Sequence, residues 1–170
     1  MVDAVAIFSE NCNFSGTIRG TVKFHQCDPN TLCKVIIDLV GFPADTLRGI
    51  HIHNWGDTRQ GCDSACAHFN PYNKLHGSEI LYGNDRHVGD MINNIQSRGG
   101  KVYLEYYDNL IDLFAPLTKN IVGRMVVIHE NADNLGFDRD TDRESATTGK
   151  AGKRIACAPI VLYGGGERCN

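Results

Sequence analysis

The chain has 170 residues, of which 42% are hydrophobic, and its formal net charge at pH 7 is -3. This size and composition suit one compact domain spanning residues 1–170. Acidic and basic residues are mixed along the chain, so it lacks the basic footprint of a nucleic-acid-binding protein. No apolar run approaches the ~20 residues needed to cross a bilayer, which argues against a membrane protein.

The N-terminal residues 2–8 are apolar from the start and have no cationic leader or small-residue cleavage site. We therefore expect no signal peptide and a cytoplasmic location. The segment is interpreted as a first strand, with Val5 and Ile7 on one face.

Further short β-like segments follow, separated by Gly, Pro, Asn and Asp. We predict strands at residues 2–8, 14–24, 33–40, 49–53, 87–95, 101–107, 121–128 and 155–163. No segment has a convincing amphipathic helical pattern. The fold class is therefore all-β, a sandwich or barrel.

Two predicted connections, residues 54–86 and 130–154, are much longer than ordinary turns. Connections in compact domains usually run ~4–6 residues, and long ones tend to carry function. We therefore expect two long functional loops.

Histidines gather in and beside these loops. Six of the seven are found there: His51, His53, His68, His76, His87 and His129. His25 stands apart and is interpreted as a structural residue. His51 and His53 are two residues apart on a predicted strand, so they point to the same face and can share one metal ion. His87 and Asp90 bring an imidazole and a carboxylate close together, a combination that suits zinc.

Six imidazoles and one carboxylate exceed one four-ligand site and are one ligand short of two. The count closes if one histidine binds two cations through its two ring nitrogens. An all-nitrogen set suits copper(II), and three nitrogens with a carboxylate suit zinc. The alternative is one structural zinc site with scattered surface histidines. Thiolate binding is disfavoured because the cysteine spacing fits no zinc module.

Two motifs resemble those of the copper–zinc superoxide dismutase family. These are Gly49-Ile50-His51-Ile52-His53-Asn54-Trp55-Gly56-Asp57 and Gly152-Lys153-Arg154-Ile155-Ala156-Cys157. Between them, His68-Phe69-Asn70-Pro71, His76-Gly77, His87-Val88-Gly89-Asp90 and Val127-Ile128-His129-Glu130 match in order and spacing. The resemblance extends over about residues 2–163.

This resemblance implies an eight-stranded Greek-key β-barrel and an enzyme that converts superoxide to dioxygen and hydrogen peroxide by copper(II)/copper(I) cycling. It implies that copper is held by His51, His53, His68 and His129, and zinc by His68, His76, His87 and Asp90. His68 would bridge the two metals and pass a proton to the product.

The resemblance also assigns roles outside the two ligand sets. Asp133 would link His51 to His76. An intrachain disulfide would join Cys62 and Cys157, and Arg154 would attract the anionic substrate. A homodimer and a copper-delivery partner are further implications. The alternative function is a non-enzymatic metal-binding or copper-chaperone-like domain, although the chain has no CxxC pair.

Some positions depart from the family pattern. Thr147 stands where many members have a guiding lysine, and Lys150 and Lys153 are nearby substitutes. Cys66 is expected to be a buried, inert thiol, with competition for the disulfide or contact with the metal rim as alternatives.

The seven cysteines are otherwise expected to be reduced, as in most intracellular proteins. Pro159 lies where family dimers have an apolar contact, whereas four residues keep the apolar character of a dimer face: Val5, Ile7, Val122 and Leu162.

Overall fold

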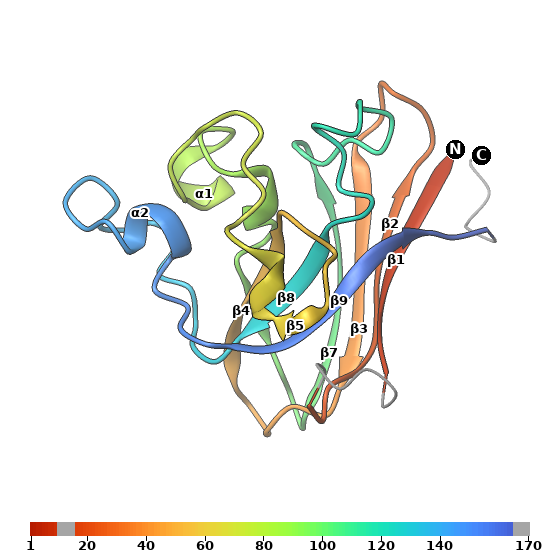
Figure 1. The fold of residues 1–170 in the computed structure, drawn as a ribbon. Coiled ribbons are helices and arrows are strands. Elements are labelled where there is room, and N and C mark those ends of the chain that lie inside the picture. Colours follow the sequence, from red (N-terminus) through yellow and green to blue (C-terminus); the bar gives the residue numbers. More distant parts are fainter. Residues whose placement is uncertain (10–15, 165–170) are drawn as a thin grey trace.

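The computed structural model describes residues 1–9 and 16–164, and β-strands dominate it (Figure 1). The strands are β1 Val2–Phe8, β2 Arg19–Gln26, β3 Cys33–Val40, β4 Leu47–His53, β5 Arg59–Cys62, β6 Asn94–Gln96, β7 Lys101–Asp108, β8 Met125–His129 and β9 Arg154–Leu162. The helical segments are short: η1 Asp63–Ala65, α1 Glu79–Tyr82, η2 Val88–Asp90 and α2 Ser145–Thr148. No helix among the described residues is long and apolar enough to span a bilayer.

Eight strands form one antiparallel sheet in the order β6-β4-β8-β9-β1-β2-β3-β7. The neighbours β4 and β8, β9 and β1, and β3 and β7 are not consecutive in the chain, which is the mark of Greek-key connections. The sheet curls into a nearly closed barrel, and its two end strands, β6 and β7, are connected by a tight turn with a bridge between Arg98 and Lys101. The predicted all-β Greek-key barrel is therefore confirmed.

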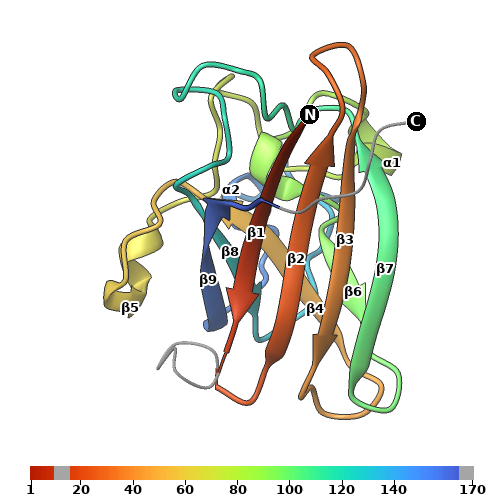
Figure 2. The same ribbon diagram turned by 90° about the vertical axis from the view of Figure 1, so that its right-hand side faces the viewer.

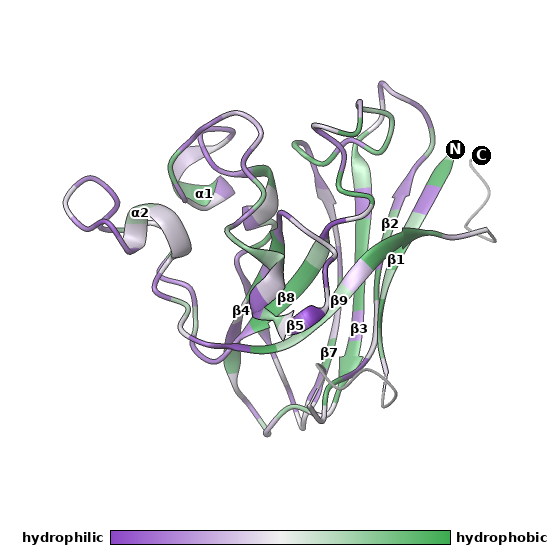
Figure 3. Ribbon diagram, in the orientation of Figure 1, coloured by the Kyte–Doolittle hydropathy of each residue, from purple (hydrophilic) through white to green (hydrophobic). Residues whose placement is uncertain are grey.

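The core lies inside this barrel because the strands bury alternate residues. In β3 the inward residues Cys33, Val35, Ile37 and Leu39 are fully buried, whereas Asp38 and Val40 are exposed. This period of two is what a half-buried antiparallel strand requires. Hydrophobic residues accordingly mark the strands, and polar residues dominate the loops (Figure 3).

The two long loops lie on the side of the barrel away from β1, β2 and β3 (Figures 1 and 2). The first carries β5, η1 and α1, and the second carries α2. Both therefore gather over the ends of β4 and β8, where the candidate ligands are attached.

The predicted strand at 87–95 is wrong over most of its length. The Asp90 carboxylate accepts from the backbone N–H of His87 at 3.0 Å, which closes the turn of η2. Met91 and Asn93 then have φ of 49° and 61°, and a strand cannot continue through that conformation. Only β6 at the end of this range is extended.

Other strand limits also shifted. The predicted strand at 14–24 becomes β2, which starts later; residues 14 and 15 lie outside the described residues. The predicted strand at 121–128 starts at Met125, because Gly123 turns the chain with φ 82°. The strand β5 inside the first loop was not predicted.

A disulfide joins Cys62 to Cys157 with a Cα–Cα distance of 5.7 Å, as expected. Cys157 is buried and packs with Ala65, Met125 and Val127, and Cys62 packs against this cluster. The bond therefore attaches the first loop to β9 in the barrel wall. Cys27 is also disulfide-bonded, so the expectation that it is reduced is wrong.

The expectation for Cys66 is wrong. Its thiol is free and exposed. Cys66 has φ 64°, and this turn directs its carbonyl oxygen, which accepts from both His53 and Arg154. The contribution of this residue to the site is therefore made by its backbone.

A second anchor holds the far end of the first loop. The Arg86 guanidinium and the Asp108 carboxylate are fully buried, and Arg86 Nη2 lies 3.2 Å from both carboxylate oxygens. Arg86 directly precedes His87, so this ion pair ties a candidate ligand to β7. Breaking a buried pair by removing one partner costs about 3–5 kcal/mol, since the other charge is left unpaired.

We predict that Cys62→Ser lowers the free energy of unfolding of the metal-free protein. The disulfide closes a loop with a sequence separation of 95. In the chain-entropy model such a cross-link contributes about 4–5 kcal/mol. Urea unfolding followed by circular dichroism measures the change.

Cys66→Ser is the matched control, since Cys66 is an exposed free thiol in the same loop. It should change the unfolding free energy by no more than about 0.5 kcal/mol. Peptide mapping that joins Cys66, rather than Cys62, to Cys157 would contradict the assignment.

Candidate metal centre

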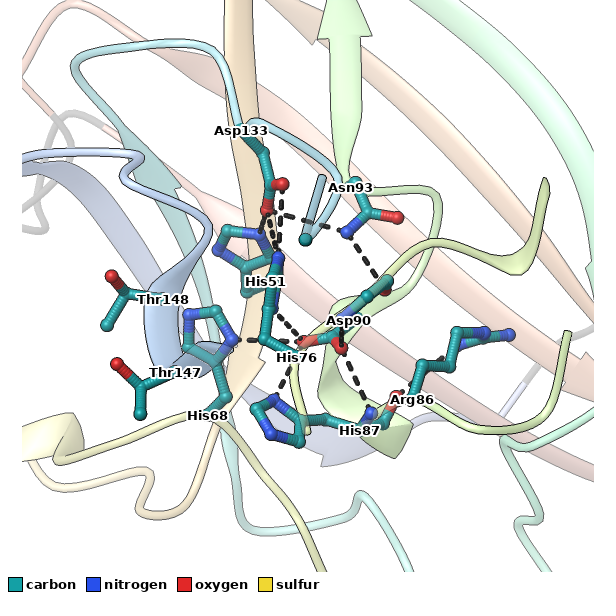
Figure 4. Close-up of polar contacts among 12 residues, drawn as sticks. His51, His68, His76, Arg86, His87, Asp90, Asn93, Asp133, Thr147 and Thr148 are labelled. Carbon is teal, nitrogen blue, oxygen red and sulfur yellow. Dashed lines mark hydrogen bonds and ion pairs between the residues drawn. The ribbon is translucent and has the colours of Figure 1, made fainter. Parts of the chain in front are cut away.

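Six imidazoles and two carboxylates are buried together at the loop end of the barrel. They belong to His51, His53, His68, His76, His87, His129, Asp90 and Asp133, and none is more than 5% exposed. Figure 4 shows part of this cluster, with His51, His68, His76 and His87 around Asp90 and Asp133. All the sequence-predicted ligands therefore meet in one place.

The strands explain how residues distant in sequence converge. His51 and His53 end β4, which pairs with β8, and His129 ends β8. His68 pairs with His53 through an isolated bridge, which brings the first loop alongside β4. Gly49 lets the second loop approach β4 closely, since a Cβ there would lie 2.9 Å from Cβ of Ala151.

Four rings form a first set, with one nitrogen from each lying within 4.8 Å of the others: His51, His53, His68 and His129. Each ring places its second nitrogen on an acceptor. His53 Nδ1 lies 2.7 Å from the Cys66 carbonyl, and His129 Nδ1 lies 3.1 Å from the Gly152 carbonyl. His51 Nε2 lies 2.5 Å from Asp133 Oδ2, and His68 Nδ1 lies 3.0 Å from Asp90 Oδ1. These contacts assign the ring protons to the outer nitrogens.

The inner nitrogens of the first set therefore carry lone pairs. His51 Nδ1 and His68 Nε2 are buried and have no hydrogen-bond partner among the described residues. His53 Nε2 and His129 Nε2 face each other at 3.3 Å, although neither has a proton to donate in this tautomer. Buried acceptors without donors are costly, and a cation satisfies all four at once. An all-imidazole set fits copper.

A second set surrounds Asp90. Its Oδ1 lies 3.0, 2.8 and 3.0 Å from Nδ1 of His68, His76 and His87, respectively. The Nε2 atoms of the last two face acceptors, because His76 meets Asp133 at 3.1 Å and His87 meets the Lys74 carbonyl at 3.0 Å. Each Nδ1 can donate to the carboxylate while it carries a proton, and a cation that lies between the rings and the carboxylate would replace these protons. Three nitrogens and one carboxylate oxygen fit zinc.

His68 belongs to both sets, with Nδ1 in the second and Nε2 in the first. Asp133 joins the sets from outside, because its carboxylate contacts both His51 and His76. Asn93 Nδ2 donates to Asp133 Oδ2 at 3.4 Å and to the Gly77 carbonyl at 3.2 Å. The sequence interpretation did not include Asn93, since a single asparagine outside any motif gives no signal.

The metal-free electrostatics favour neutral rings in the first set. Burial, reinforced by neighbouring histidines, holds the pKa values of His53 and His68 well below their usual range. Burial and His51 lower the pKa of His129 to about 3. Burial also lowers the pKa of His76, but its bonds to Asp133 and Asp90 outweigh that effect and raise it to about 9. Neutral imidazole is the form that binds metal.

Arg154 lies directly beside the first set. Its Nη1 donates to the Cys62 and Asp63 carbonyls at 2.7 and 3.2 Å, and its Nη2 donates to the Cys66 carbonyl at 2.5 Å. The same Cys66 oxygen accepts from His53. One carbonyl therefore separates the guanidinium from a ring of the first set.

The two lysines of the second loop near Arg154 differ in their surroundings. Lys150 forms an ion pair with Asp142 at 3.0 Å and lies 3.9 Å from Asp138, so acidic groups of its own loop offset its charge. Lys153 is exposed and lines a surface pocket that Arg154 also lines. The Thr147 hydroxyl in α2 donates to the Arg143 carbonyl, just before this helix, at 2.9 Å.

Comparison with known proteins agrees with this geometry. Residues 18–160 match the family model described as copper/zinc superoxide dismutase (SODC). The chain belongs to the copper/zinc superoxide dismutase family. The family member named Superoxide dismutase [Cu-Zn] from Schizosaccharomyces pombe is 42% identical over 162 residues, covering 95% of this chain and 99% of that protein.

One further relative and one solved structure agree with this family match. The Superoxide dismutase [Cu-Zn] of Saccharomyces cerevisiae is 41% identical, covering 95% of this chain and 99% of that protein. The crystal structure of the clock protein EA4 superposes with a TM-score of 0.81 at 34% identity and covers 95% of both chains.

We predict that acidification destabilises the metal-free protein. In the folded state the pKa of His129 is lowered to about 3, whereas an unfolded histidine titrates near about 6.5. Between these values the unfolded chain binds more protons, so the free energy of unfolding falls as the pH falls from about 6.5 to about 4. Urea unfolding across this range measures it.

His76 opposes this trend only above that window. Its raised pKa of about 9 adds stability that is complete below about pH 6.5 and is lost as the pH rises through about 9. His129→Gln should make the acid dependence shallower. Stability that rises on acidification from about pH 6.5 would contradict the prediction.

Proposed function

We propose that the protein disproportionates superoxide at a centre in which copper is held by His51, His53, His68 and His129, and zinc by His68, His76, His87 and Asp90. The observation that carries this proposal is the placement of His68, whose two ring nitrogens face the two complete sets. When bound, copper supplies the alternating one-electron oxidation and reduction that disproportionation requires.

His68 is also the residue placed to handle a proton. Its ring is buried, and its Nδ1 is directed to Asp90, so Nε2 is the atom free to hold and donate a proton to the reduced product. Asp90 is fixed in turn, because its Oδ2 accepts from the backbone N–H groups of Gly77 and His87 at 3.0 Å. This support keeps the His68 ring in one orientation.

Arg154 is the proposed guide for the anion. Its guanidinium stays charged at any physiological pH and is fixed by three carbonyls of the disulfide-linked loop. The chain is acidic overall, so capture of an anion needs a local positive field. Lys153 adds charge to the same pocket, whereas Lys150 is occupied by Asp142.

A non-enzymatic metal-binding or copper-chaperone-like domain is disfavoured. Such a domain needs one transfer site, whereas this chain provides both ligand sets and a positive charge beside the first. The enzyme remains the proposal that uses all of these groups.

We also propose that residues 1–170 act as one domain in a cytoplasmic homodimer that receives copper from a delivery partner. Ile7 and Leu162, both expected on the dimer face, are 52% and 65% exposed, although Val5 is buried. The β1–β9 ladder ends at Ile160, so Pro159 costs no bond to β1 there. Sedimentation velocity measures the assembly, and cell fractionation measures the location.

We predict one copper and one zinc per chain. His68→Gln removes a ligand from both sets, so it should weaken the binding of both metals, and the copper(II) signal should no longer respond to removal of zinc. Elemental analysis and electron paramagnetic resonance measure this. His25→Gln is the control, since His25 is outside both sets. One metal per chain with both supplied in excess would contradict the proposal.

We predict that Arg154→Ala lowers kcat/KM by about 10-fold or more, because focused positive charge raises the capture of anions by roughly 10–1000-fold. This range of rate increases describes charged clefts in general, and superoxide dismutases are among the proteins from which it is known. Arg154→Lys should retain most of the activity, and Arg154→Glu should lose more than the alanine variant. Metal content should be unchanged in all three.

The salt dependence of kcat/KM separates steering from structural damage. Steering is screened over a Debye length of about 8–10 Å near physiological ionic strength, so the slope should flatten in Arg154→Ala. Lys153→Gln should flatten it partly, and Lys150→Gln, matched in charge change, should leave it nearly unaltered. Equal slopes in wild type and Arg154→Ala would exclude a guiding role for Arg154.

A further inference from the structure

The two long loops contact each other beside the second set, through an arginine of the second loop. The helices α1 of the first loop and α2 of the second lie on the same side of the barrel (Figure 1). The Arg139 guanidinium lies over the ring of Tyr82, the last residue of α1, with 3.4 Å between Cζ and the ring centroid. The Tyr82 hydroxyl donates to the Gly136 carbonyl at 2.8 Å. Each loop therefore contributes a side chain that binds the other loop.

The polar end of Arg139 binds the first loop close to two candidate ligands. Its Nη2 lies 2.7 Å from Asp85 Oδ2, and its Nη1 donates to the Asp85 carbonyl at 2.7 Å and to the His76 carbonyl at 3.5 Å. The Arg139 side chain is only 9% exposed, so its charge depends on these partners. Asp85 precedes His87 by two residues, so the arginine contacts the chain at one ligand and close to another.

His76 is held by the second loop at three points. Its backbone N–H donates to the Ala146 carbonyl in α2 at 2.8 Å, and its carbonyl accepts from Arg139. Its Nε2 lies 3.1 Å from Asp133 Oδ1. All three partners belong to the second loop, whereas His76 belongs to the first. The orientation of this ligand therefore depends on the two loops staying in contact.

Two glycines allow this contact to be close. A Cβ at Gly77 would lie 2.6 Å from Cδ2 of Tyr82 and 3.0 Å from Nη1 of Arg139. A Cβ at Gly136, whose φ is 72°, would lie 2.7 Å from the His76 carbonyl oxygen. The loops are therefore packed against each other on both sides of the Arg139 side chain.

A second cation also binds Asp85 but does not join the loops. Lys74 Nζ lies 3.3 Å from Asp85 Oδ1, and both residues belong to the first loop. The two side chains are 46% and 53% exposed, and ion pairs in that environment contribute little. Of the two cations on Asp85, Arg139 is therefore the one that links the loops.

We propose that Arg139 is a positioning residue for the metal centre, which holds the second loop against His76 through Asp85 and Tyr82 and thereby slows the release of zinc. This inference rests on the proposed assignment of zinc to the second set. Zinc leaves only when its ligands turn away from it, and the contact around Arg139 opposes that movement at His76.

The first set depends less on this contact. His51 and His53 belong to β4 and His129 to β8, so three of its four rings are attached to the barrel wall. Loosening the loops should therefore release zinc and leave copper bound, whereas general unfolding would release both metals.

The test mixes metal-loaded protein with an excess of the chelator 4-(2-pyridylazo)resorcinol near pH 7 and follows zinc release by absorbance. Arg139→Gln should release zinc about tenfold faster, since it loses the charge-assisted bonds and the contact with the Tyr82 ring. Arg139→Lys keeps an ion pair with Asp85 and should recover part of the slow release. Lys74→Gln has the same charge change and removes the other ion pair of Asp85, so it should stay within about twofold of wild type.

Two further measurements separate positioning from general damage. Elemental analysis of the protein after zinc release should find copper retained in every variant. Asp85→Asn should also speed zinc release, and the double variant with Arg139→Gln should be no more than about twofold faster than Arg139→Gln alone, because both residues belong to one contact. Tyr82→Leu takes the place of Arg139→Gln if that variant fails to fold.

Equal zinc release by wild type and Arg139→Gln would overturn this inference alone, as would loss of copper in step with zinc. A wild-type protein that binds no zinc would overturn the assignment of the second set as well, so the two failures are distinguished.

Discussion

Burial of six imidazoles and two carboxylates at one end of the barrel is the constraint on which the rest of the structure depends. Polar groups removed from water must be paired, and here the outer nitrogens are paired while the inner ones are not. The carboxylate oxygen of Asp90 meets three rings at once. Cations in both sets resolve these conflicts, so metal binding and folding are coupled at this end of the molecule.

The two loops that bring the rings together have little regular structure of their own, so separate anchors hold them. The Cys62–Cys157 disulfide attaches one end of the first loop to β9, and the Arg86–Asp108 pair attaches the other end to β7. Between these anchors the bridge from His68 to His53 holds the loop alongside β4. The carbonyl of Cys66 lies near the first anchor and orients both His53 and Arg154.

Sequence patterns predicted the parts of the fold where one physical rule acts alone. The limits of β1 and β3 were predicted correctly because both segments are mainly apolar, and in β3 alternating burial against the barrel core produces a period of two. The segment 87–95 was mispredicted because the Asp90 side chain caps its own turn and overrides that pattern. The ligand candidates and the outer carboxylate of Asp133 could be predicted as side chains, but the other outer acceptors could not. These other acceptors, the Cys66, Gly152 and Lys74 carbonyls, are backbone atoms, and any residue carries them.

His25, where β1 starts and β2 ends, has different surroundings from the histidines of the metal centre. The neighbouring acceptors decide how each ring is oriented. Around the first set each ring is directed outward to one acceptor, which leaves a lone pair inside for a cation. In His25 the same outward bond to Asp3 leaves the second nitrogen facing the Cys27 sulfur. A carboxylate that fixes one ring nitrogen thus decides what the other nitrogen faces: lone pairs that a cation can satisfy in the metal centre, and a sulfur atom at His25.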